Sequence, residues 1–368
     1  MKIICSTELL NQACQNIQRV VSSKTSIPAI EGIFMQAANG KLSLTGYDLE
    51  VGIHTDLDVK VEEEGSIVIN ARILCDILRR LPAETVIIEA DERQLCVIRC
   101  GETEYKIVGI AAEEYPELPS ITGGVPVLVD ADILSQMVKQ TIFAVSTNDT
   151  KVIHTGVKFE IKAGELRLIA VDGFRMAIRT EKINYDGNDL QFVVPAKTLS
   201  EVIKLLDDAD VVSLNVAKRH IIFEVGSYSV ISRLLDGEFL DYHAAVPKTH
   251  STEVLVDVKT LMDSIDRTSL LITDRLKSPL RCVFDENVIR ISTTTTLGTA
   301  NDRLPANIQG DRVEIGFNNR FLLDALRVCN QEKVKITLNG PLSPITIIPT
   351  EGNSFLFLVL PVRLRNEG

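Results

Sequence analysis

The chain has 368 residues, of which 45% are apolar and 24% charged, and it contains 21 Gly and 13 Pro. This ordinary globular composition excludes a disordered chain, a collagen and a disulfide-stapled miniprotein. The 50 acidic and 39 basic residues give a net charge of −11, which argues against non-specific cationic binding by the average surface. The length predicts two or three domains, and three is our working number.

The seven cysteines are odd in number, scattered and without a CxxC pair. This pattern favours reduced, buried thiols in a cytosolic protein. The start, MKIICSTELLNQ, turns polar too early for a secretory signal, and no apolar run approaches the roughly 20 residues of a membrane span. We therefore predict a cytoplasmic location and no membrane partner.

In chain order, two helical patterns alternate three times. The first pattern begins after an N-cap residue, at Ser6, Asp130 and Asp257. The second follows a strand-like segment, at 71–81, 196–206 and 319–329, so its copies start 125 and 123 residues apart. Short alternating segments add roughly eight strands per repeat. The sequence therefore predicts an α+β fold of three repeated domains, each with two helices packed on antiparallel sheets, at 1–123, 124–250 and 251–368.

The second helix carries basic residues at two recurring positions seven residues apart, which places them on one face. These positions are Arg72, Lys197 and Arg320, then Arg79, Lys204 and Arg327. An acid also recurs four residues after the first basic position, as Asp76, Glu201 and Asp324. A surface helix adapted for solubility shows the same pattern. Three copies in an acidic chain equally favour a positive inner surface that binds phosphates without reading bases.

An enzyme is the rival class, with a hydrolase or transferase site at a domain junction. The five histidines lack metal-binding spacing, and GxSxG, P-loop and GxGxxG motifs are absent. Asp172 resembles a catalytic carboxylate on a turn, with His154 as its best acid–base partner. However, Asp48 recurs at the matching place in the first repeat, which favours a turn-forming role. We predict no catalytic residue, no metal and no cofactor.

Four segments resemble the β subunit of bacterial DNA polymerase III, the sliding-clamp family, and the resemblance covers essentially the whole chain. They are LSLTGYDLEV from residue 42, VDGFRMAI from 171, LLDGEFLDY from 234 and VLPVRL from 359. The resemblance implies a non-enzymatic processivity factor: a head-to-tail homodimer whose six domains close a ring around duplex DNA of any sequence. It implies as partners the polymerase III α subunit, the clamp-loader δ subunit and other clamp-motif proteins. A separate ATP-driven loader would open the ring.

Helix geometry supports two chains per ring. At roughly 9 to 10 Å per packed helix, six helices form a ring only about 18 Å across at the helix axes. A duplex roughly 20 Å wide could not pass through it. Twelve helices give about 36 Å, which leaves space for DNA and water.

The resemblance also implies three sets of site residues. Those facing DNA are Lys24, Arg72, Arg79, Arg80, Asn148, Lys151, Lys197 and Lys204. Those lining a hydrophobic pocket for partner peptides are His154, Val171, Gly173, Phe174, Arg175, Met176, Leu240, Leu342, Pro344, Leu358, Val359, Leu360, Pro361, Val362, Arg363 and Leu364. Those at the dimer interface are Tyr105 and Ile107 from an edge strand of the first domain, with Leu271 and Ile272 from the third.

Two alternatives to these assignments stay open. The four interface residues fit an ordinary core equally well, and FLFLVLPV also reads as an ordinary last strand. A non-ring adaptor that binds peptides through VLPVRL and never touches DNA is the third functional hypothesis.

Overall fold

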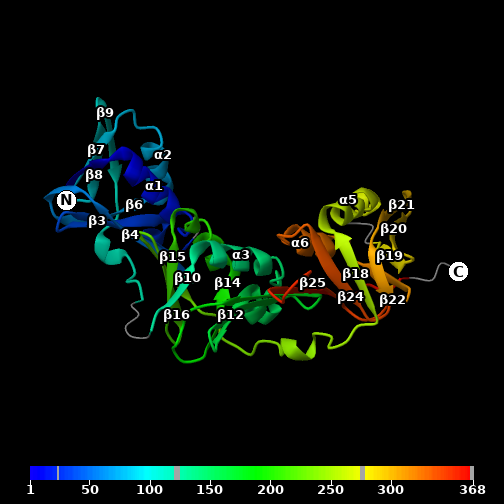
Figure 1. Ribbon diagram of the computed structural model, residues 1–368. Coiled ribbons are helices and arrows are strands. Elements are labelled where there is room, and N and C mark those ends of the chain that lie inside the picture. The colour runs from blue at the N-terminus through cyan, green and yellow to red at the C-terminus, as the bar shows by residue number, and fades with distance from the viewer. Residues whose placement is uncertain (23–24, 120–124, 274–277, 365–368) are drawn as a thin grey trace. The chain divides into compact units, whose positions relative to one another are not determined.

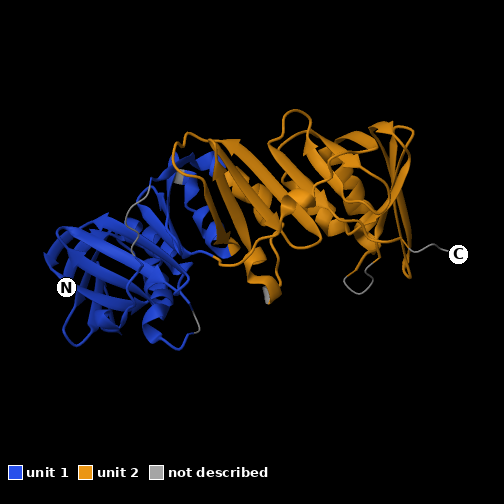
Figure 2. Ribbon diagram, turned by 90° about the horizontal axis from the view of Figure 1, so that it is seen from below, with its two compact units in different colours: residues 1–134, 197–234 blue, residues 135–196, 235–368 orange. Residues whose placement is uncertain are grey.

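A computed structural model describes residues 1–22, 25–119, 125–273 and 278–364. It contains two compact units, 1–134 with 197–234 and 135–196 with 235–368 (Figure 2). Within the described residues, no helix is long and apolar enough to span a membrane.

Each repeat supplies two main helices and eight or nine described strands (Figure 1). The first repeat contains β1 (Lys2–Ser6), α1 (Thr7–Gln18), β2 (Gly32–Ala38), β3 (Lys41–Tyr47), β4 (Val51–Asp58), β5 (Lys60–Glu63), β6 (Gly65–Asn70), α2 (Ala71–Leu78), β7 (Thr85–Ala90), β8 (Leu95–Cys100) and β9 (Thr103–Val108). The second contains β10 (Val127–Asp130), α3 (Ala131–Ile142), β11 (Gly156–Lys162), β12 (Glu165–Val171), β13 (Arg175–Lys182), β14 (Leu190–Pro195), α4 (Ala196–Val202), β15 (Val211–Val216), β16 (His220–Val225) and β17 (Tyr228–Arg233). The third contains β18 (Thr252–Asp257), α5 (Val258–Thr268), β19 (Leu280–Asp285), β20 (Val288–Thr295), β21 (Gly298–Pro305), β22 (Asn307–Gly310), β23 (Val313–Phe317), α6 (Asn319–Arg327), β24 (Lys333–Leu338), β25 (Ile345–Pro349) and β26 (Phe355–Val359).

The strands form antiparallel sheets, as the sequence predicts. Unit 1 has a five-stranded sheet, β5-β1-β7-β8-β9, and an eight-stranded sheet, β10-β15-β16-β17-β4-β3-β2-β6. Unit 2 has a nine-stranded sheet, β14-β11-β12-β13-β26-β25-β24-β18-β22, and a four-stranded sheet, β21-β20-β19-β23. Helices α1 and α2 pack side by side in unit 1, and α5 and α6 do so in unit 2 (Figure 1).

The predicted N-caps are confirmed. Ser6 accepts a hydrogen bond from the Leu9 amide at 3.4 Å, and Asp130 accepts one from the Ile133 amide at 3.0 Å. Asp257 does the same for Thr260 at 2.7 Å. Side-chain oxygens thus satisfy amides that lack a partner within the first helical turn.

The second helices are shorter than predicted, because they end at 78, 202 and 327 and not at 81, 206 and 329. Bonds from Arg80 to Ile77 and from Leu205 to Val202, both 2.9 Å, tighten the chain after α2 and α4 into 3₁₀-type turns. In the first copy Pro82 follows Leu81, and proline disfavours helical geometry in the residue before it. The second basic position therefore lies just beyond α2 and α4.

Two strand pairings join consecutive repeats in the same register. In unit 1, β4 pairs with β17 so that Val51 lies opposite Ser232. In unit 2, β13 pairs with β26 so that Arg175 lies opposite Val359. Val51 and Arg175 occupy the same place in their repeats, each three residues after the turn aspartate, Asp48 or Asp172, so both pairings begin at the same point of the strand.

The same bond extends both pairings by one residue. The Arg233 amide donates to the Glu50 carbonyl at 2.9 Å, and the Leu360 amide donates to the Phe174 carbonyl at 2.9 Å. In both cases, therefore, the last strand of one repeat pairs with the preceding repeat through the same backbone hydrogen bond.

Candidate functional site

The basic positions of the repeated helix are solvent-exposed, as predicted. The Arg72 side chain is 87% exposed, and its Nε lies 4.0 Å from Asp76. The recurring acid pairs more closely with the second basic position: Asp76 with Arg79 at 3.6 Å, Glu201 with Lys204 at 2.8 Å, and Asp324 with Arg327 at 3.6 Å. Arg80 also lies 3.6 Å from Asp76. The face is therefore positive but partly neutralised by its own acids.

Lys197 is paired differently from Arg72. Its ammonium group donates to Asp48 in the β3–β4 turn of unit 1. The other oxygen of Asp48 accepts from the amides of Glu50 and Val51, at 3.0 and 2.8 Å. This geometry confirms the turn-forming role predicted for Asp48, and it ties α4 to the turn of the preceding repeat.

The remaining residues predicted to face DNA lie in different parts of the chain. Lys24 lies outside the described residues. Asn148 and Lys151 belong to unit 2 and are exposed, and the Asn148 side chain accepts from the Thr150 amide at 3.0 Å. The structure thus places Arg72, Arg79 and Arg80 within 4.0 Å of Asp76 on α2, whereas Asn148 and Lys151 belong to a 3₁₀ segment at 149–155 and its N-cap.

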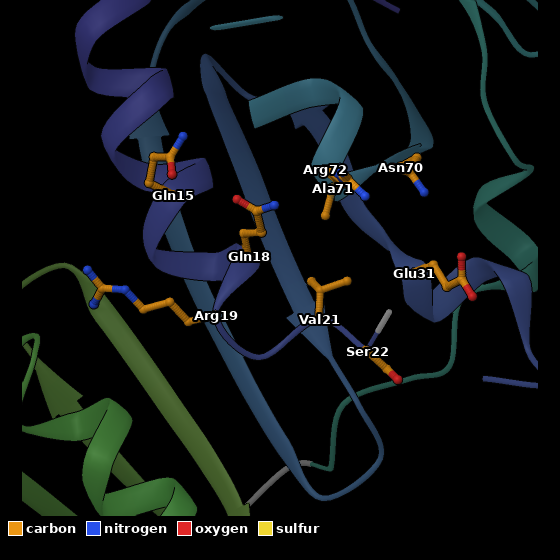
Figure 3. Close-up of a pocket in the computed structure, with 9 residues that line it drawn as sticks. All are labelled: Gln15, Gln18, Arg19, Val21, Ser22, Glu31, Asn70, Ala71 and Arg72. Carbon is orange, nitrogen blue, oxygen red and sulfur yellow. The ribbon is translucent and has the colours of Figure 1, made fainter. Parts of the chain in front are cut away.

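A polar hollow of about 640 Å³ lies between the end of α1 and the start of α2 (Figure 3). Gln15, Gln18 and the C-cap residue Arg19 line it on the α1 side, and Asn70 and Arg72 line it on the α2 side; the Arg19 side chain extends away from Arg72. Arg19 makes no ion pair with a described residue, and Gln15 accepts from Arg79 at 3.0 Å. Sequence reasoning missed the three α1 residues, although their i, i+3, i+4 spacing predicts one shared helix face.

The peptide-pocket set is centred on one apolar row in unit 2. Val171, Met176 and Leu358 lie directly opposite one another on β12, β13 and β26. They pack in one buried cluster with Ile169 and Tyr242. Opposite residues of antiparallel strands share a face, so this row forms a continuous apolar floor.

The β12–β13 turn borders this floor. Asp172 accepts from the amides of Phe174 and Arg175, at 2.9 and 3.1 Å, and Gly173 has a φ of +88° that favours glycine. Phe174 is 61% exposed, and its carbonyl holds the Leu360 amide. The turn therefore presents an aromatic side chain next to the start of the C-terminal segment.

Arg175 lies at the centre of contacts that sequence reasoning missed. It bonds Asp172 at 2.8 Å and Asp324 at 2.6 Å, and its guanidinium lies 4.6 Å from the ring centre of Phe321. Phe321 also stacks on Phe174, with ring centres 6.1 Å apart. No local signal marks Phe321, because the matching helical positions hold Ile73 and Thr198 in the other repeats.

Most of the other residues predicted to line the peptide pocket are exposed or half-buried, and they lie outside the buried apolar row. Leu342, Val362, Arg363 and Leu364 line a separate hollow of about 620 Å³, where the Val362 amide donates to the Gly316 carbonyl at 2.8 Å. Among the other members, Leu240 and Leu360 are exposed, Pro344 and Pro361 are half-buried, and Val359 is buried beside Ile345.

His154 contacts the apolar cluster through Phe239, with ring centres 5.3 Å apart in an edge arrangement. Its Nε2 is buried without a hydrogen-bond partner among the described residues. Burial, and then the Lys151 charge, lowers the pKa of His154. Since Asp172 is engaged by the turn and by Arg175, the structure gives no support to an acid–base pair of Asp172 with His154. No group of three potential metal ligands occurs in the described parts of the chain.

The four predicted interface residues lie at two sheet edges. Tyr105 and Ile107 are half-buried on β9, the edge strand of the five-stranded sheet. Leu271 and Ile272 are half-buried after α5, in a turn that packs against β20 and β21. Within the described residues, β9 and β21 each have a strand on one side only.

Comparison with known proteins decides the family. Models of the N-terminal, central and C-terminal domains of the DNA polymerase III beta subunit match residues 1–119, 128–241 and 243–363. The chain belongs to the DNA polymerase III β subunit family. It is therefore built of three clamp domains and is a DNA sliding clamp that confers processivity, not an enzyme.

Individual relatives agree over the full length. The beta sliding clamp of Bacillus subtilis is 31% identical over 99% of this chain and all of its own, and the structure of that clamp superposes with a TM-score of 0.97. A putative β subunit from Eubacterium rectale is 30% identical with a TM-score of 0.95, covering 99% of this chain and 100% of its own. A Pseudomonas aeruginosa clamp bound to griselimycin is 26% identical with a TM-score of 0.94, at the same coverage.

Proposed function

We propose that two copies of this chain close head to tail into a six-domain ring around duplex DNA. The shared register of the β4–β17 and β13–β26 pairings carries this proposal. A closed head-to-tail ring needs a third junction of the same kind, formed between two copies of the chain. It would join the last strand of the first repeat in one copy to the strand of the third repeat that matches β4 in the other copy. Those strands are β9 and β21, each of which is an open edge of its sheet.

The repeats define the register of this third junction. The β8–β9 and β16–β17 hairpins match through Gly101 and Gly226, both with φ of +57°, so β9 residues precede their β17 counterparts by 125. The β3–β4 and β20–β21 hairpins likewise match with an offset of 247. Val108 then corresponds to Arg233, and Leu297 corresponds to Glu50. Val108 of one copy would lie opposite Leu297 of the other.

Exposure and charge support this register. Val108 on β9 is 80% exposed and Leu297 in the β20–β21 turn is 65% exposed, so pairing of the two edges would cover one apolar side chain on each. The same register sets Glu102 opposite Arg303, and both are exposed without an ion pair to any described residue. Tyr105 and Ile107 fall within the paired stretch of β9. Leu271 and Ile272 belong to the turn after α5, and this turn packs against β21.

A charge exchange tests the closure. Glu102→Arg and Arg303→Glu should each place like charges opposite one another and weaken the dimer, as measured by analytical ultracentrifugation. The double variant should recover most of the lost affinity, because the pair is restored in reverse. Independent, additive losses in the double variant would contradict the register.

Inside the ring, the DNA-facing residues named above would hold phosphates weakly and without sequence preference. The exposed guanidinium and ammonium groups of Arg72, Arg79, Arg80, Lys197 and Lys204 support this role, and Arg19 in the adjoining hollow extends it. Contacts to phosphate fix position but carry no sequence information, so they permit sliding. Topological closure would keep the ring on DNA.

The row of Val171, Met176 and Leu358 would capture short peptide motifs of partner proteins. An apolar floor, an exposed aromatic at Phe174 and a half-buried Arg175 at the rim suit extended-peptide capture. The partners would be the polymerase III α subunit, the loader δ subunit and other clamp-motif proteins. Met176→Asp should abolish α-subunit binding in surface plasmon resonance while the dimer persists; unchanged binding would remove this assignment.

The wider setting follows from the same function. We place the domains at 1–123, 124–250 and 251–368; the matched ranges 1–119 and 128–241 lie within the first two, whereas the third matched range starts at residue 243, before the proposed boundary at 251. A replication factor acts where bacterial DNA is copied, so the location would be cytoplasmic. No cofactor is required, since opening the ring would fall to a separate loader.

A further inference from the structure

A second apolar row runs beside the row that floors the peptide pocket. It lies two residues further along each of the same strands and comprises Ile169, Ile178 and Leu356, again directly opposite one another. Side chains alternate between faces, so both rows share a face and lie about 7 Å apart. Ile169 is buried, whereas Ile178 and Leu356 are only partly covered. The apolar surface that floors the peptide pocket therefore extends beyond it, along the same three strands.

A hollow of about 460 Å³ lies over this second row. Its walls are the segment 242–248, Ile348 on β25 and the turn at Gly352 and Asn353. The volume falls within the usual range of ligand sites, about 300 to 1,000 Å³. Tyr242 connects the two sites, because it lines the hollow and also packs in the pocket's apolar cluster.

The charges at the hollow have one sign. Arg167 and Lys248 line it, and no aspartate or glutamate among the described residues does. Arg167 is engaged, since it donates to the Tyr242 hydroxyl at 3.2 Å and lies 3.7 Å from Glu165. Lys248 is exposed and makes no ion pair with a described residue. A carboxylate entering the hollow would therefore find one available ammonium group above an apolar floor.

We propose that this hollow is a second docking site for the same partner chain that fills the peptide pocket, and that it takes an acidic residue followed by a large apolar one. The inference rests on the proposed peptide capture. Two residues of extended chain cover about 7 Å, so a spacer of two to four residues joins the two sites. The site would distinguish partners by the sequence flanking their motif.

The probe is a synthetic peptide selected from a random heptamer library for binding to the wild-type chain but not to Met176→Asp. It is then extended at either end by Gly-Gly-Asp-Leu, Gly-Gly-Lys-Leu or Gly-Gly-Ser-Ser, and Kd is measured by fluorescence anisotropy. The Asp-Leu extension at one end should tighten binding about tenfold, from one ion pair and one buried leucine. The Ser-Ser extension should leave Kd unchanged.

Variants of the full chain assign the gain to the hollow. Lys248→Glu should cancel the preference for Asp over Lys, and Ile348→Ser should reduce the gain from both apolar extensions. Lys259→Glu on α5, which does not line the hollow, is the control and should behave like wild type.

Equal effects of the Asp-Leu and Lys-Leu extensions, or no gain at either end, would overturn the second site and leave the pocket intact. Failure to select any peptide that depends on Met176 would instead remove the pocket and the second site together.

Discussion

The paired and the open strand edges of this chain occupy equivalent places in the repeats but carry different side chains. At the β4–β17 junction the terminal pair is Glu50 and Arg233, and at β13–β26 it is Phe174 and Leu360. At the open edges the matching residues are Leu297 and Val108, both largely exposed. Junctions within one chain are also held by connectivity, whereas an open edge has only non-covalent energy. Covering each of these two side chains would contribute about 1.5 to 3 kcal/mol.

The largest expected effect comes from breaking the open edge. In the proposed register the amides of Lys106 and Val108 both point toward the partner copy. Amides alternate in direction along a strand, and the Gly109 amide points the other way, where it donates to the Gln94 carbonyl. Lys106→Pro removes that donor, and proline is tolerated on an edge strand of the free chain. The dimer should weaken at least about a hundredfold in sedimentation, while circular dichroism stays unchanged. Lys106→Ala is the matched control and should dimerise normally.

A change at the paired edge of β26 should have the opposite result: it should abolish stimulation of the polymerase and leave the dimer intact. Deleting Leu360 to Gly368 removes the bond to Phe174 but leaves β26 itself in the sheet. Stimulation of polymerase should fall to background in primer extension, while ring mass is retained. Normal stimulation by this truncation would exclude the C-terminal segment from the pocket.

Charge reversal on the helices sharpens the contrast between edge and interior. Replacing Arg72, Lys197 and Arg320 together by Glu should shorten retention on nicked circular DNA by about tenfold or more, because phosphate attraction becomes repulsion. Dimerisation should be unaffected, since these residues lie outside both open edges. A triple change of the exposed strand residues Lys41, Lys60 and Lys162 to Glu is the control. Equal losses in both triples would show a general charge effect and contradict the inner-face assignment.

The smallest effect concerns pH. Because burial lowers the pKa of His154, the folded state binds fewer protons there than the unfolded state below the ordinary histidine pKa. Stability contributed by the neutral ring is therefore present at pH 7 and is lost as the pH falls below about 6.5 and through the lowered pKa of the folded state. His154→Leu should flatten the decline in thermal stability between pH 7 and 5. A variant with the wild-type slope would show that another group causes the decline.

Local chemistry explains what the sequence could predict. Caps at Ser6, Asp130 and Asp257, the basic helix positions and the turn at Asp48 all depend on residues within a few positions of one another. The contacts of Arg175 with Asp324 and Phe321, and of Lys197 with Asp48, join residues about 150 apart and follow only from the packed fold. The register of the open edges likewise required the two paired junctions as a template.

The most direct test of ring closure is solution mass combined with small-angle X-ray scattering at micromolar concentration. Ring closure predicts a particle of twice the 40.6 kDa chain mass with the scattering profile of a hollow ring. A compact monomer at every concentration would contradict closure through β9 and β21, and would favour an adaptor that binds peptides without encircling DNA.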